Sequence, residues 1–412
     1  ARGADPLGVI ASGFGFAYVQ EALRDLGARG RVWTGKIGVP YPLSEELITR
    51  MLDGCEKILV VEEGDPLVEA QVRLLAQASE SRCAVAGKMF AGELALTGEL
   101  STDKVIAALA SLLSIPLPQE EERRRVKAEN SAVIPPRSST LCAGCPHLGT
   151  YWAINQVIKN DKKHMPVLNG DIGCYEQGGY GIKGQMPVPS DAPAARYPSK
   201  IPYDMLDTIY IMGSGISMAQ GQARSGFPDG RYLAVAGDST FFHTCMPGLL
   251  NAVWNDTKVT FVVMDNAWTA MTGHQICPAT GMTPRGDPAE VVKIEAVAGS
   301  MGVKSVVVAD PYHLDDVMRA VREAVEFDGV AVVVARGECI LQVVRREGKT
   351  RGRTLVTEDC TGCKICTEIG CPAITFKNNL AGIDELLCVN CGICAQACPD
   401  FAIVEQKVRE GA

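Results

Sequence analysis

Short apolar runs alternate with amphipathic stretches in the first part of the chain. The runs at 8–13 (GVIASG) and 57–64 (KILVVEEG) are typical of buried strands that end in glycine-containing turns. Each leads into a stretch with helical periodicity, at 16–27 and at 66–78. Strand, turn and helix in succession predict a parallel sheet, so we expect a doubly wound α/β domain over residues 1–115.

The middle of the chain repeats this pattern on a larger scale. Four apolar runs rich in valine and alanine have the composition of buried parallel strands. Amphipathic stretches such as 313–327 lie between them, which predicts a second doubly wound parallel-sheet domain over 141–345. The four runs are 232–239 (YLAVAGDS), 259–266 (VTFVVMDN), 303–310 (VKSVVVAD) and 329–337 (GVAVVVARG).

Polar segments separate these domains from each other and from the end of the chain. Residues 118–130 form a charge run and 134–139 (IPPRSS) are rich in proline and serine, which predicts a solvated linker over 116–140. A basic segment, REGKTRGR, opens the last part of the chain, 346–412.

This last part contains eight of the sixteen cysteines, in two runs that each end in Cys-Pro. In a two-cluster ferredoxin, three thiolates of one run and the fourth cysteine of the other hold each 4Fe–4S cluster. Zinc takes four ligands per site and has no need of two interleaved sets. A disulfide scaffold is unusual in a large chain without a secretory signal. We therefore predict a small two-cluster ferredoxin-like domain, with one cluster on Cys360, Cys363, Cys366 and Cys398 and the other on Cys371, Cys388, Cys391 and Cys394.

The first cysteine run departs from the ferredoxin spacing at one point. Four residues separate Cys366 from Cys371, where the pattern has three. We expect the extra residue to reshape a loop beside the second cluster and to change its reduction potential, which depends on local hydrogen bonds and exposure.

Composition narrows the class of protein. Of 412 residues 47% are hydrophobic, and the formal net charge of −8 argues against a nucleic acid partner. No run approaches the roughly 18–20 apolar residues that span a bilayer. Free thiols at this density indicate a reducing cytoplasm. The opening ARGADPLG is neither a signal peptide nor a methionine start, so we expect the chain to begin within a longer polypeptide.

The middle domain carries the pattern of a metal–diphosphate site. Gly237, Asp238 and Ser239 end one apolar run, and Asp265 and Asn266 end the next. The missing side chain of the glycine would let a diphosphate approach, and α/β proteins bind ligands at the carboxyl ends of their strands. A carboxylate and an amide oxygen suit a hard cation such as magnesium. Because serine replaces the second glycine of the usual motif, a plain strand end is the alternative interpretation.

The run 213–221 (GSGISMAQG) supports the cofactor interpretation. It follows a short predicted strand and opens a helix of small residues. Main-chain N–H groups at such a helix N-terminus bind diphosphates, so we expect Gly213, Ser214 and Gly215 to contact the cofactor.

Four further cysteines lie near these motifs. Cys142 and Cys145 form a CxxC step after the linker, Cys174 ends GDIGC, and Cys339 follows a buried strand. Four such thiolates could hold a third cluster. Alternatively, the CxxC step could bind another metal, and Cys339 could be a small buried hydrophobe.

Histidines beside the motifs are candidates for acid–base chemistry. His147 follows the CxxC step, and His243 follows GDST. For each of them a structural role is the alternative, because a single histidine specifies little.

In their order along the chain, these motifs resemble one family. The first α/β unit, CAGCPH, GDIGC, GDSTFFH, MDN with TAMTG, and the ferredoxin run are arranged as in thiamine-diphosphate-dependent 2-oxoacid:ferredoxin oxidoreductases. The chain most resembles the large (alpha) subunits of indolepyruvate ferredoxin oxidoreductases, over almost its whole length. KIGVPYPL and VVEEGDPLVEAQVR are similar to the transketolase-C-like domain of those subunits.

The resemblance implies roles for individual residues. Asp238 and Asn266 would hold magnesium, while Gly170, Asp171 and 213–221 would border thiamine diphosphate in a diphosphate-binding domain. The cysteines matching a proximal cluster beside the cofactor are Cys142, Cys145, Cys174 and Cys339.

The resemblance also implies a reaction and partners. The reaction is the oxidative decarboxylation of an aryl 2-oxoacid to the acyl-CoA, with electrons passing through 4Fe–4S clusters to ferredoxin or another acceptor. The expected partners are a chain or segment with the pyrimidine-binding domain, and a smaller gamma-type (beta) subunit.

Three departures from the family stand out. The pyrimidine-binding domain, with its activating glutamate, does not precede the segment that opens here, so we expect it on a separate chain or in a preceding segment. Leu148 stands where an arginine is expected, and 178–202 resembles an insertion near the substrate. The last two leave the 2-oxoacid open, with arylglyoxylates such as phenylglyoxylate as the alternative.

Two other classes of function stay open. One is an electron-transfer subunit without thiamine chemistry of its own, against which the Gly-Asp and Asn pattern argues. The other is a non-redox thiamine-dependent decarboxylase whose ferredoxin part serves another partner.

Overall fold

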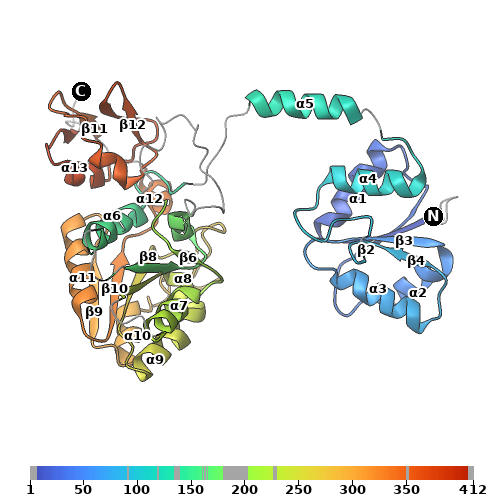
Figure 1. Cartoon of the computed structure of the whole chain (residues 1–412), viewed down its shortest axis with the longest axis horizontal. Coiled ribbons are helices and arrows are strands. Elements are labelled where there is room, and N and C mark those ends of the chain that lie inside the picture. The colour runs from blue at the N-terminus through green and yellow to red at the C-terminus, as the bar shows by residue number, and fades with distance from the viewer. Residues whose placement is uncertain are drawn as a thin grey trace. The chain divides into compact units, whose positions relative to one another are not determined.

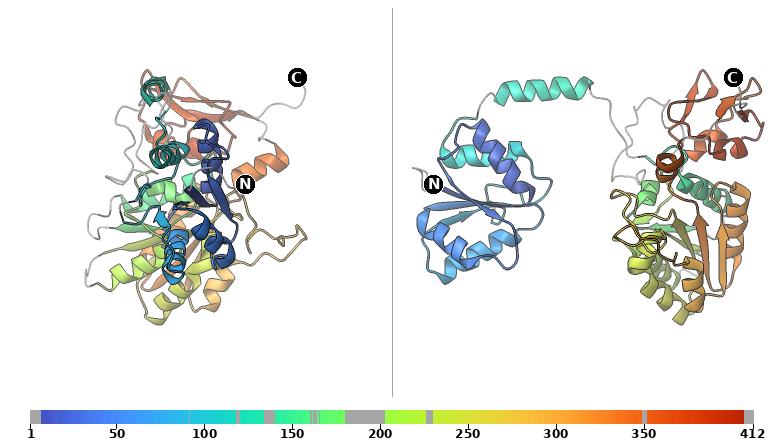
Figure 2. Two further views of the ribbon diagram at one scale, coloured as in Figure 1. Left: turned by 90° about the vertical axis from the view of Figure 1, so that its right-hand side faces the viewer. Right: turned by 180° about the vertical axis from the view of Figure 1, so that it is seen from behind.

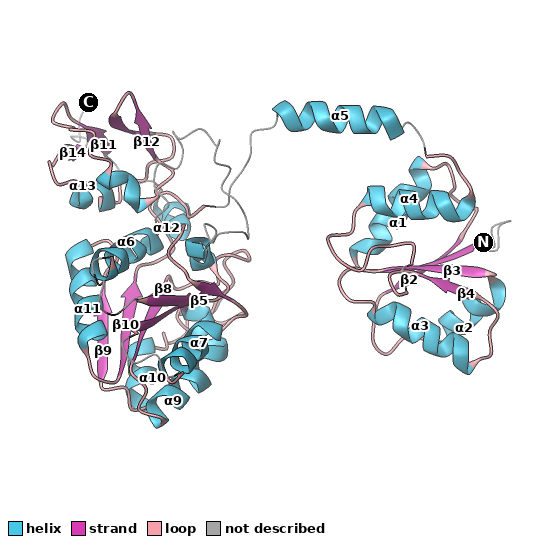
Figure 3. Ribbon diagram, in the orientation of Figure 1, coloured by secondary structure: helices cyan, strands magenta, loops and turns pink. Residues whose placement is uncertain are grey.

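The computed structural model describes residues 7–90, 92–117, 120–133, 140–159, 161, 164, 166–179, 203–225, 230–348 and 352–406. The chain divides into two units, 1–135 and 136–412. Each is built around a parallel sheet flanked by helices (Figures 1 and 3), as the doubly wound α/β prediction requires. Within these residues, no helix combines the length and apolar character needed to cross a membrane.

A four-stranded parallel sheet forms the centre of the first unit. Its strands are β1 (Leu7–Ser12), β2 (Trp33–Ile37), β3 (Lys57–Val61) and β4 (Ala84–Ala86), in the order β2-β1-β3-β4. The flanking helices are α1 (Phe14–Asp25), α2 (Glu45–Gly54), α3 (Leu67–Ala78) and α4 (Thr102–Leu113). Because successive strand residues face opposite sides, Val9 and Leu59 pack with α1 and α4, while Ile10 and Ile58 pack with α2 and α3.

A six-stranded parallel sheet forms the centre of the second unit, in the order β6-β5-β7-β8-β10-β9. Its strands are β5 (Val167–Gly170), β6 (Thr208–Ile209), β7 (Tyr232–Gly237), β8 (Val259–Asp265), β9 (Ser305–Ala309) and β10 (Val330–Arg336). The central strands β7 and β8 are buried along their whole length, as expected for strands covered on both faces.

Helices cover both faces of this sheet. Figures 1 and 2 show α6 (Pro146–Ile158) and α11 (Leu314–Glu326) on one face. The other face carries α7 (Ser214–Ala223), α9 (Met246–Trp254) and α10 (Ile294–Ser300). The short α8 (Asp238–Thr240) and the π-helical η2 (Phe241–Cys245) connect β7 to α9, and α12 (Ile340–Glu347) follows β10. The segments with the expected site residues therefore follow β5, β7, β8 and β10, at the carboxyl edge of the sheet.

The ferredoxin-like part belongs to the second unit. Strand β11 (Arg353–Val356) pairs with β14 (Ile403–Gln406), and β12 (Ile374–Lys377) pairs with β13 (Leu380–Ile383), both antiparallel. The 3-10 helix η3 (Ile365–Ile369) and α13 (Ile393–Ala397) follow the CxxC steps. The buried Ile369, Ile374, Ile393 and Ile403 of the ferredoxin-like part are continuous with the core around the six-stranded sheet. The part of the second unit built on that sheet, residues 141–345, is called the diphosphate-binding domain below, after the expectation from sequence.

The segment expected to be a linker contains a helix, α5 (Glu120–Val133), in its described part. Arg125 forms ion pairs with Glu122 at i,i+3 and with Glu129 at i,i+4, which favours a helix without a buried face. The proline-rich residues 134–139 lie outside the described residues.

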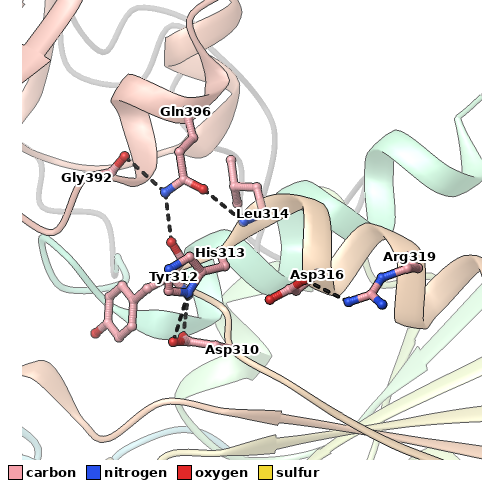
Figure 4. Close-up of polar contacts among 8 residues, drawn as sticks. All are labelled: Asp310, Tyr312, His313, Leu314, Asp316, Arg319, Gly392 and Gln396. Carbon is pink, nitrogen blue, oxygen red and sulfur yellow. Dashed lines mark hydrogen bonds and ion pairs between the residues drawn. The ribbon is translucent and has the colours of Figure 1, made fainter.

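Gln396 of α13 joins the ferredoxin-like part to the diphosphate-binding domain (Figure 4). Its Nε2 donates to the main-chain oxygen of Tyr312 at 2.7 Å, and its Oε1 accepts from the N–H of Leu314 at 3.1 Å. Leu314 is the first residue of α11, so this side chain satisfies one of the free N–H groups at the helix start. Nearby, the Tyr203 hydroxyl donates to the main-chain oxygen of Gly370 at 2.8 Å.

Replacing Gln396 with alanine is expected to lower the free energy of unfolding of the second unit by about 1–2 kcal/mol, since the Leu314 N–H loses its side-chain acceptor. Anaerobic urea unfolding, followed through the visible absorbance of the clusters, measures this change. Arg319→Ala, which removes the exposed ion pair with Asp316 on the same helix (Figure 4), is the control. Equal losses in the two variants would contradict the assigned role.

Candidate functional site

Thiols of both cysteine runs line a small cavity in the ferredoxin-like part. Phe376 and Ile403 complete its wall. Burial and the neighbouring thiols of Cys363, Cys398 and Cys360 raise the pKa of Cys366 to about 11. The structure thus brings the fourth cysteine of the second run to the three of the first: the lining thiols are Cys360, Cys363, Cys366 and Cys398.

A second cavity is lined by the other four thiols of the two runs and by Gly144 of the diphosphate-binding domain. Burial is the main cause that raises the pKa of Cys391 to about 11. Among the described residues, no three His, Cys, Asp or Glu side chains are grouped to hold a single metal ion. Four thiols spread around a cavity instead fit a 4Fe–4S cluster, because each thiolate binds a different iron atom and the ligands stay apart. These four thiols are Cys371, Cys388, Cys391 and Cys394.

The four-residue spacer before Cys371 contacts the diphosphate-binding domain. It comprises the end of η3 and Gly370, whose φ of 70° is left-handed. The main-chain oxygen of Gly370 is the acceptor for the Tyr203 hydroxyl. The extra residue therefore lies at the contact between the two parts, and its effect on the potential of the second cluster stays a prediction.

Four cysteines of the diphosphate-binding domain lie close together although three segments supply them. Burial raises the pKa of Cys145 well above its ordinary value, and Cys142, Cys174 and Cys339 raise it further. Burial and the neighbouring Cys339 and Cys142 likewise raise the pKa of Cys174 to about 12. A proximal cluster on these four thiols stays a prediction, and its binding would displace their protons.

Gly144 lies between this group and the second cavity. Its N–H donates to the Cys371 sulfur, and its carbonyl oxygen accepts from the Tyr312 hydroxyl at 3.0 Å. Its φ is 73°, and an added Cβ would lie 2.2 Å from Cγ2 of Val389. Only glycine fits here, because both the left-handed backbone and the close approach exclude a side chain.

Asp238 and Asp265 place two carboxylates together at the carboxyl edge of the sheet. Both side chains are buried, and burial together with Asp265 raises the pKa of Asp238 well above its ordinary value. Oδ1 of Asp238 accepts from the Ser239 N–H at 2.6 Å, whereas its buried Oδ2 has no hydrogen-bond partner among the described residues. A divalent cation would satisfy this oxygen and offset the repulsion between the carboxylates. The donor set therefore fits magnesium.

Asn266 lies beside this pair and also contacts the cysteine group. Its Oδ1 accepts from the Trp268 N–H at 3.0 Å, which leaves a second lone pair for a cation. Its Nδ2 is 3.3 Å from Nε2 of His147, and its main-chain oxygen accepts from the N–H of Cys339 at 3.0 Å. Burial lowers the pKa of His147 to about 4, so this imidazole is neutral at pH 7.

The N-terminus of α7 does not offer the free N–H groups that the sequence predicted. The buried Asp171 carboxylate accepts from the N–H of Gly213 at 2.9 Å and from that of Gly215. The Ser214 hydroxyl donates to the main-chain oxygen of Gly170 at 3.4 Å. Because a helix N-terminus favours negative charge, the carboxylate takes the place expected for the phosphate. Burial of this carboxyl raises its pKa to about 6.

The surroundings of two further expected site residues are now visible. An added Cβ at Gly237 would meet the ring of Tyr175 at 2.8 Å, so this glycine packs against an aromatic ring. His243 has an exposed side chain on η2, whereas Asp238 and Asn266 are buried, and its acid–base role stays a prediction. Residues 180–202, most of the expected insertion, lie outside the described residues.

Sequence reasoning missed several polar residues of the site. Arg336 ends β10 and is bonded to Asp265 at 2.7 Å, and Glu295 of α10 binds the same guanidinium. The sequence did contain a signal for this ion pair, because Arg336 ends one apolar run and Asp265 ends another. Tyr175 and Tyr312 gave no such signal, because distant segments supply their partners.

Known protein families match three parts of the chain. Residues 2–131 match the indolepyruvate oxidoreductase domain, and residues 191–335 match the C-terminal TPP-binding domain of thiamine pyrophosphate enzymes. Residues 381–404 match the 4Fe-4S binding domain. These matches fall on the three parts described above, in the same order.

Among curated relatives, the indolepyruvate oxidoreductase subunit IorA of Pyrococcus horikoshii is 37% identical over 98% of this chain. The IorA subunit of Archaeoglobus fulgidus is 35% identical over 98%. The chain spans 61% of the length of each. Among solved structures, a 2-oxoglutarate:ferredoxin oxidoreductase from Magnetococcus marinus is 20% identical to this chain. The match covers 50% of this chain and 65% of that chain, with a TM-score of 0.40.

Proposed function

Because the chain belongs to the family of thiamine-diphosphate-dependent oxidoreductases that includes the indolepyruvate oxidoreductase subunits, we propose that it is a subunit of a 2-oxoacid:acceptor oxidoreductase. The substrate is an aryl 2-oxoacid, indolepyruvate or another arylpyruvate, and the product is its acyl-CoA. The balanced reaction is R–CO–COO⁻ + CoA–SH + 2 oxidised ferredoxin → R–CO–S–CoA + CO2 + H⁺ + 2 reduced ferredoxin.

One observation carries the proposal: main-chain hydrogen bonds join the residues of the expected metal site to a group of cysteines. The main-chain oxygen of Asn266 accepts from the N–H of Cys339, and Gly144 links the same thiol group to Cys371 of the ferredoxin-like part. Such continuity supports one-electron transfer away from the cofactor. A non-redox decarboxylase would have no need of it.

The side chains at the edge of the sheet have separable roles in this proposal. Oδ2 of Asp238 and Oδ1 of Asn266 would hold the magnesium ion of the cofactor. When bound, thiamine diphosphate supplies the electron sink for loss of carbon dioxide from a 2-oxoacid. The neutral imidazole of buried His147 lies against the Asn266 amide and orients it.

The iron–sulfur clusters would form an exit path for electrons. The proximal cluster is assigned to the cysteines of the diphosphate-binding domain, followed by the cluster that includes Cys371 and then by the one that includes Cys398. With three clusters, the chain is expected to hold about twelve iron atoms.

Cys174→Ala tests the third cluster, because alanine leaves no ligand atom at this position. We expect iron to fall from about twelve to about eight atoms per chain, because one 4Fe–4S cluster is lost and two remain. Iron analysis and electron paramagnetic resonance (EPR) of the reduced protein measure this. Cys277→Ala is the matched control, since this half-buried thiol lies outside the group. Unchanged iron in both variants would exclude the proximal cluster.

The experiment that tests the function is anaerobic purification with co-eluting subunits, followed by dye and ferredoxin reduction with a panel of 2-oxoacids. We expect a partner with the pyrimidine-binding domain and a gamma-type subunit, and rapid reduction with arylpyruvates plus coenzyme A. Fastest turnover with phenylglyoxylate would favour an arylglyoxylate oxidoreductase of the same family. Failure to release thiamine diphosphate on denaturation would favour a pure electron-transfer subunit. Aldehyde formation without ferredoxin reduction would favour a non-redox decarboxylase.

A further inference from the structure

Main-chain hydrogen bonds join two neighbouring loops at the carboxyl edge of the sheet and continue the strand pairing beyond it. Strands β8 and β10 pair in parallel up to Asp265 and Arg336. Beyond that point, the N–H of Gly337 donates to the main-chain oxygen of Asp265 at 2.9 Å, and the N–H of Cys339 donates to that of Asn266 at 3.0 Å. The proposed metal ligand and the proposed cluster ligand are therefore held in one hydrogen-bonded register.

Side chains reinforce the same pair of loops. Nε1 of Trp268 is 3.3 Å from Oε1 of Glu338, so the indole of one loop donates to the carboxylate of the other. Nε of Arg336 donates to Oδ2 of Asp265 at 2.7 Å. Together with the two main-chain bonds, these contacts join 265–268 to 336–339 at four points.

Arg336 is the centre of this arrangement. Its two terminal nitrogens bind both carboxylate oxygens of Glu295, at 2.5 and 3.1 Å, while its Nε binds Asp265. The guanidinium is planar and always charged, so it holds its two carboxylate partners in fixed directions. Glu295 lies on α10, which anchors the arginine outside the two loops.

The charge of Arg336 also acts on the metal site. Asp265 is 4% exposed and lies against Asp238, the proposed magnesium ligand. Without the arginine, Asp265 would be a buried carboxylate beside a second one with no fixed counterion. Asp265 would then compete with the metal ligands or turn away, and its loop would lose its register with Cys339.

We propose that Arg336 is a positioning residue that, through Asp265 and Glu295, fixes the spacing between the magnesium–diphosphate site and the Cys339 cluster, so that cofactor binding and cluster potential are coupled. The inference rests on the proposed function. It concerns residues of this chain that are assigned neither as ligands of the magnesium ion nor as ligands of a cluster.

The test uses the complex purified anaerobically with its subunits, freed of cofactor and then titrated with thiamine diphosphate and Mg²⁺. Calorimetry gives the affinity, and EPR-monitored redox titration gives the cluster potentials with and without the two ligands. The variants are Arg336→Met, Arg336→Lys and Glu295→Gln. Arg319→Met, which breaks only an exposed ion pair on α11, is the matched control.

In the wild type and in Arg319→Met, thiamine diphosphate with Mg²⁺ is expected to shift the potential of one cluster. In Arg336→Met the affinity should fall by about 10- to 100-fold, the loss typical for groups that orient metal ligands, and the shift should be absent even at saturation. Lysine keeps the positive charge but cannot bind Asp265 and Glu295 in fixed directions, and Glu295→Gln removes the charge of one partner of Arg336. Both variants should therefore give an affinity and a potential shift between those of the wild type and Arg336→Met. These two variants carry the test if Arg336→Met does not assemble.

Two results would overturn the inference alone: a wild-type complex that binds the cofactor without any shift, or an Arg336→Met complex with wild-type affinity or with a full shift at saturation. If Arg336→Met bound thiamine diphosphate more weakly but still showed the full shift in cluster potential, the arginine would have a structural role only. A wild-type complex that does not bind thiamine diphosphate would overturn the proposed function as well, so the two failures are distinguishable.

Discussion

Asp238→Ala is expected to abolish binding of thiamine diphosphate while the ferredoxin clusters remain. The affinity should fall by more than about 100-fold, because a direct metal ligand is lost, and changes one step further from a metal already cost about 10- to 100-fold. The variant removes the buried Oδ2 that has no other partner among the described residues. Calorimetric titration with the cofactor and Mg²⁺, alongside iron analysis, measures both effects on one sample.

Two further variants separate a ligand role from a structural one. Asp238→Asn keeps the shape of the side chain but removes a charge that is buried beside Asp265. It should therefore bind the cofactor poorly and yet make the cofactor-free protein more stable, because burying an unpaired charge is costly. Asp328→Ala, at an almost fully exposed carboxylate, should change neither property. Loss of iron together with the cofactor in Asp238→Ala would contradict the separation of the two sites.

Gly144→Ala is the second change with a large expected effect. The left-handed backbone costs alanine about 1–2 kcal/mol, and forcing a methyl group against Val389 adds about 1–3 kcal/mol. We expect a loss of about 2–5 kcal/mol in the free energy of unfolding of the second unit. Anaerobic chemical unfolding measures the stability, and reduction of ferredoxin by the complex shows whether electrons still pass between the two parts.

Two glycines provide controls for the two causes. Gly286 also has a left-handed φ, 88°, but no atom within 4 Å of an added Cβ, so Gly286→Ala isolates the backbone cost. Gly221 lies in α7 with open space around it, so Gly221→Ala should be neutral or stabilising. If Gly144→Ala cost no more than Gly286→Ala, the close contact with Val389 would be unimportant.

The sequence predicted best those residues whose partners follow from local spacing. Each ferredoxin cavity has the four cysteines that the crossing of two runs predicts, because CxxC steps and a Cys-Pro are short-range features. Asp238 and Asn266 could be paired because parallel strands that carry them end at the same edge of a sheet. The strands themselves were predicted because buried parallel strands read as uninterrupted apolar runs.

Residues whose role depends on a distant partner could not be assigned in this way. The helix N-terminus at Gly213 has the pattern of a phosphate site, but the carboxylate of Asp171, which follows β5, accepts from its N–H. Gly237 has the pattern of an open approach, but Tyr175 from another segment packs against it. A local pattern shows which groups a segment offers, and tertiary packing decides which of them are already bound.

The contacts between the ferredoxin-like part and the diphosphate-binding domain also decide what kind of electron carrier it is. Gln396, Tyr203 and Gly144 hold it at three places, and both parts share one continuous core. It is therefore fixed to that domain and does not move as a separate arm. With the proposed clusters in place, electron transfer between the ferredoxin-like part and the cysteine group would need no diffusional search within the chain. A ferredoxin domain from another protein would have to reproduce the surface that meets Gly144.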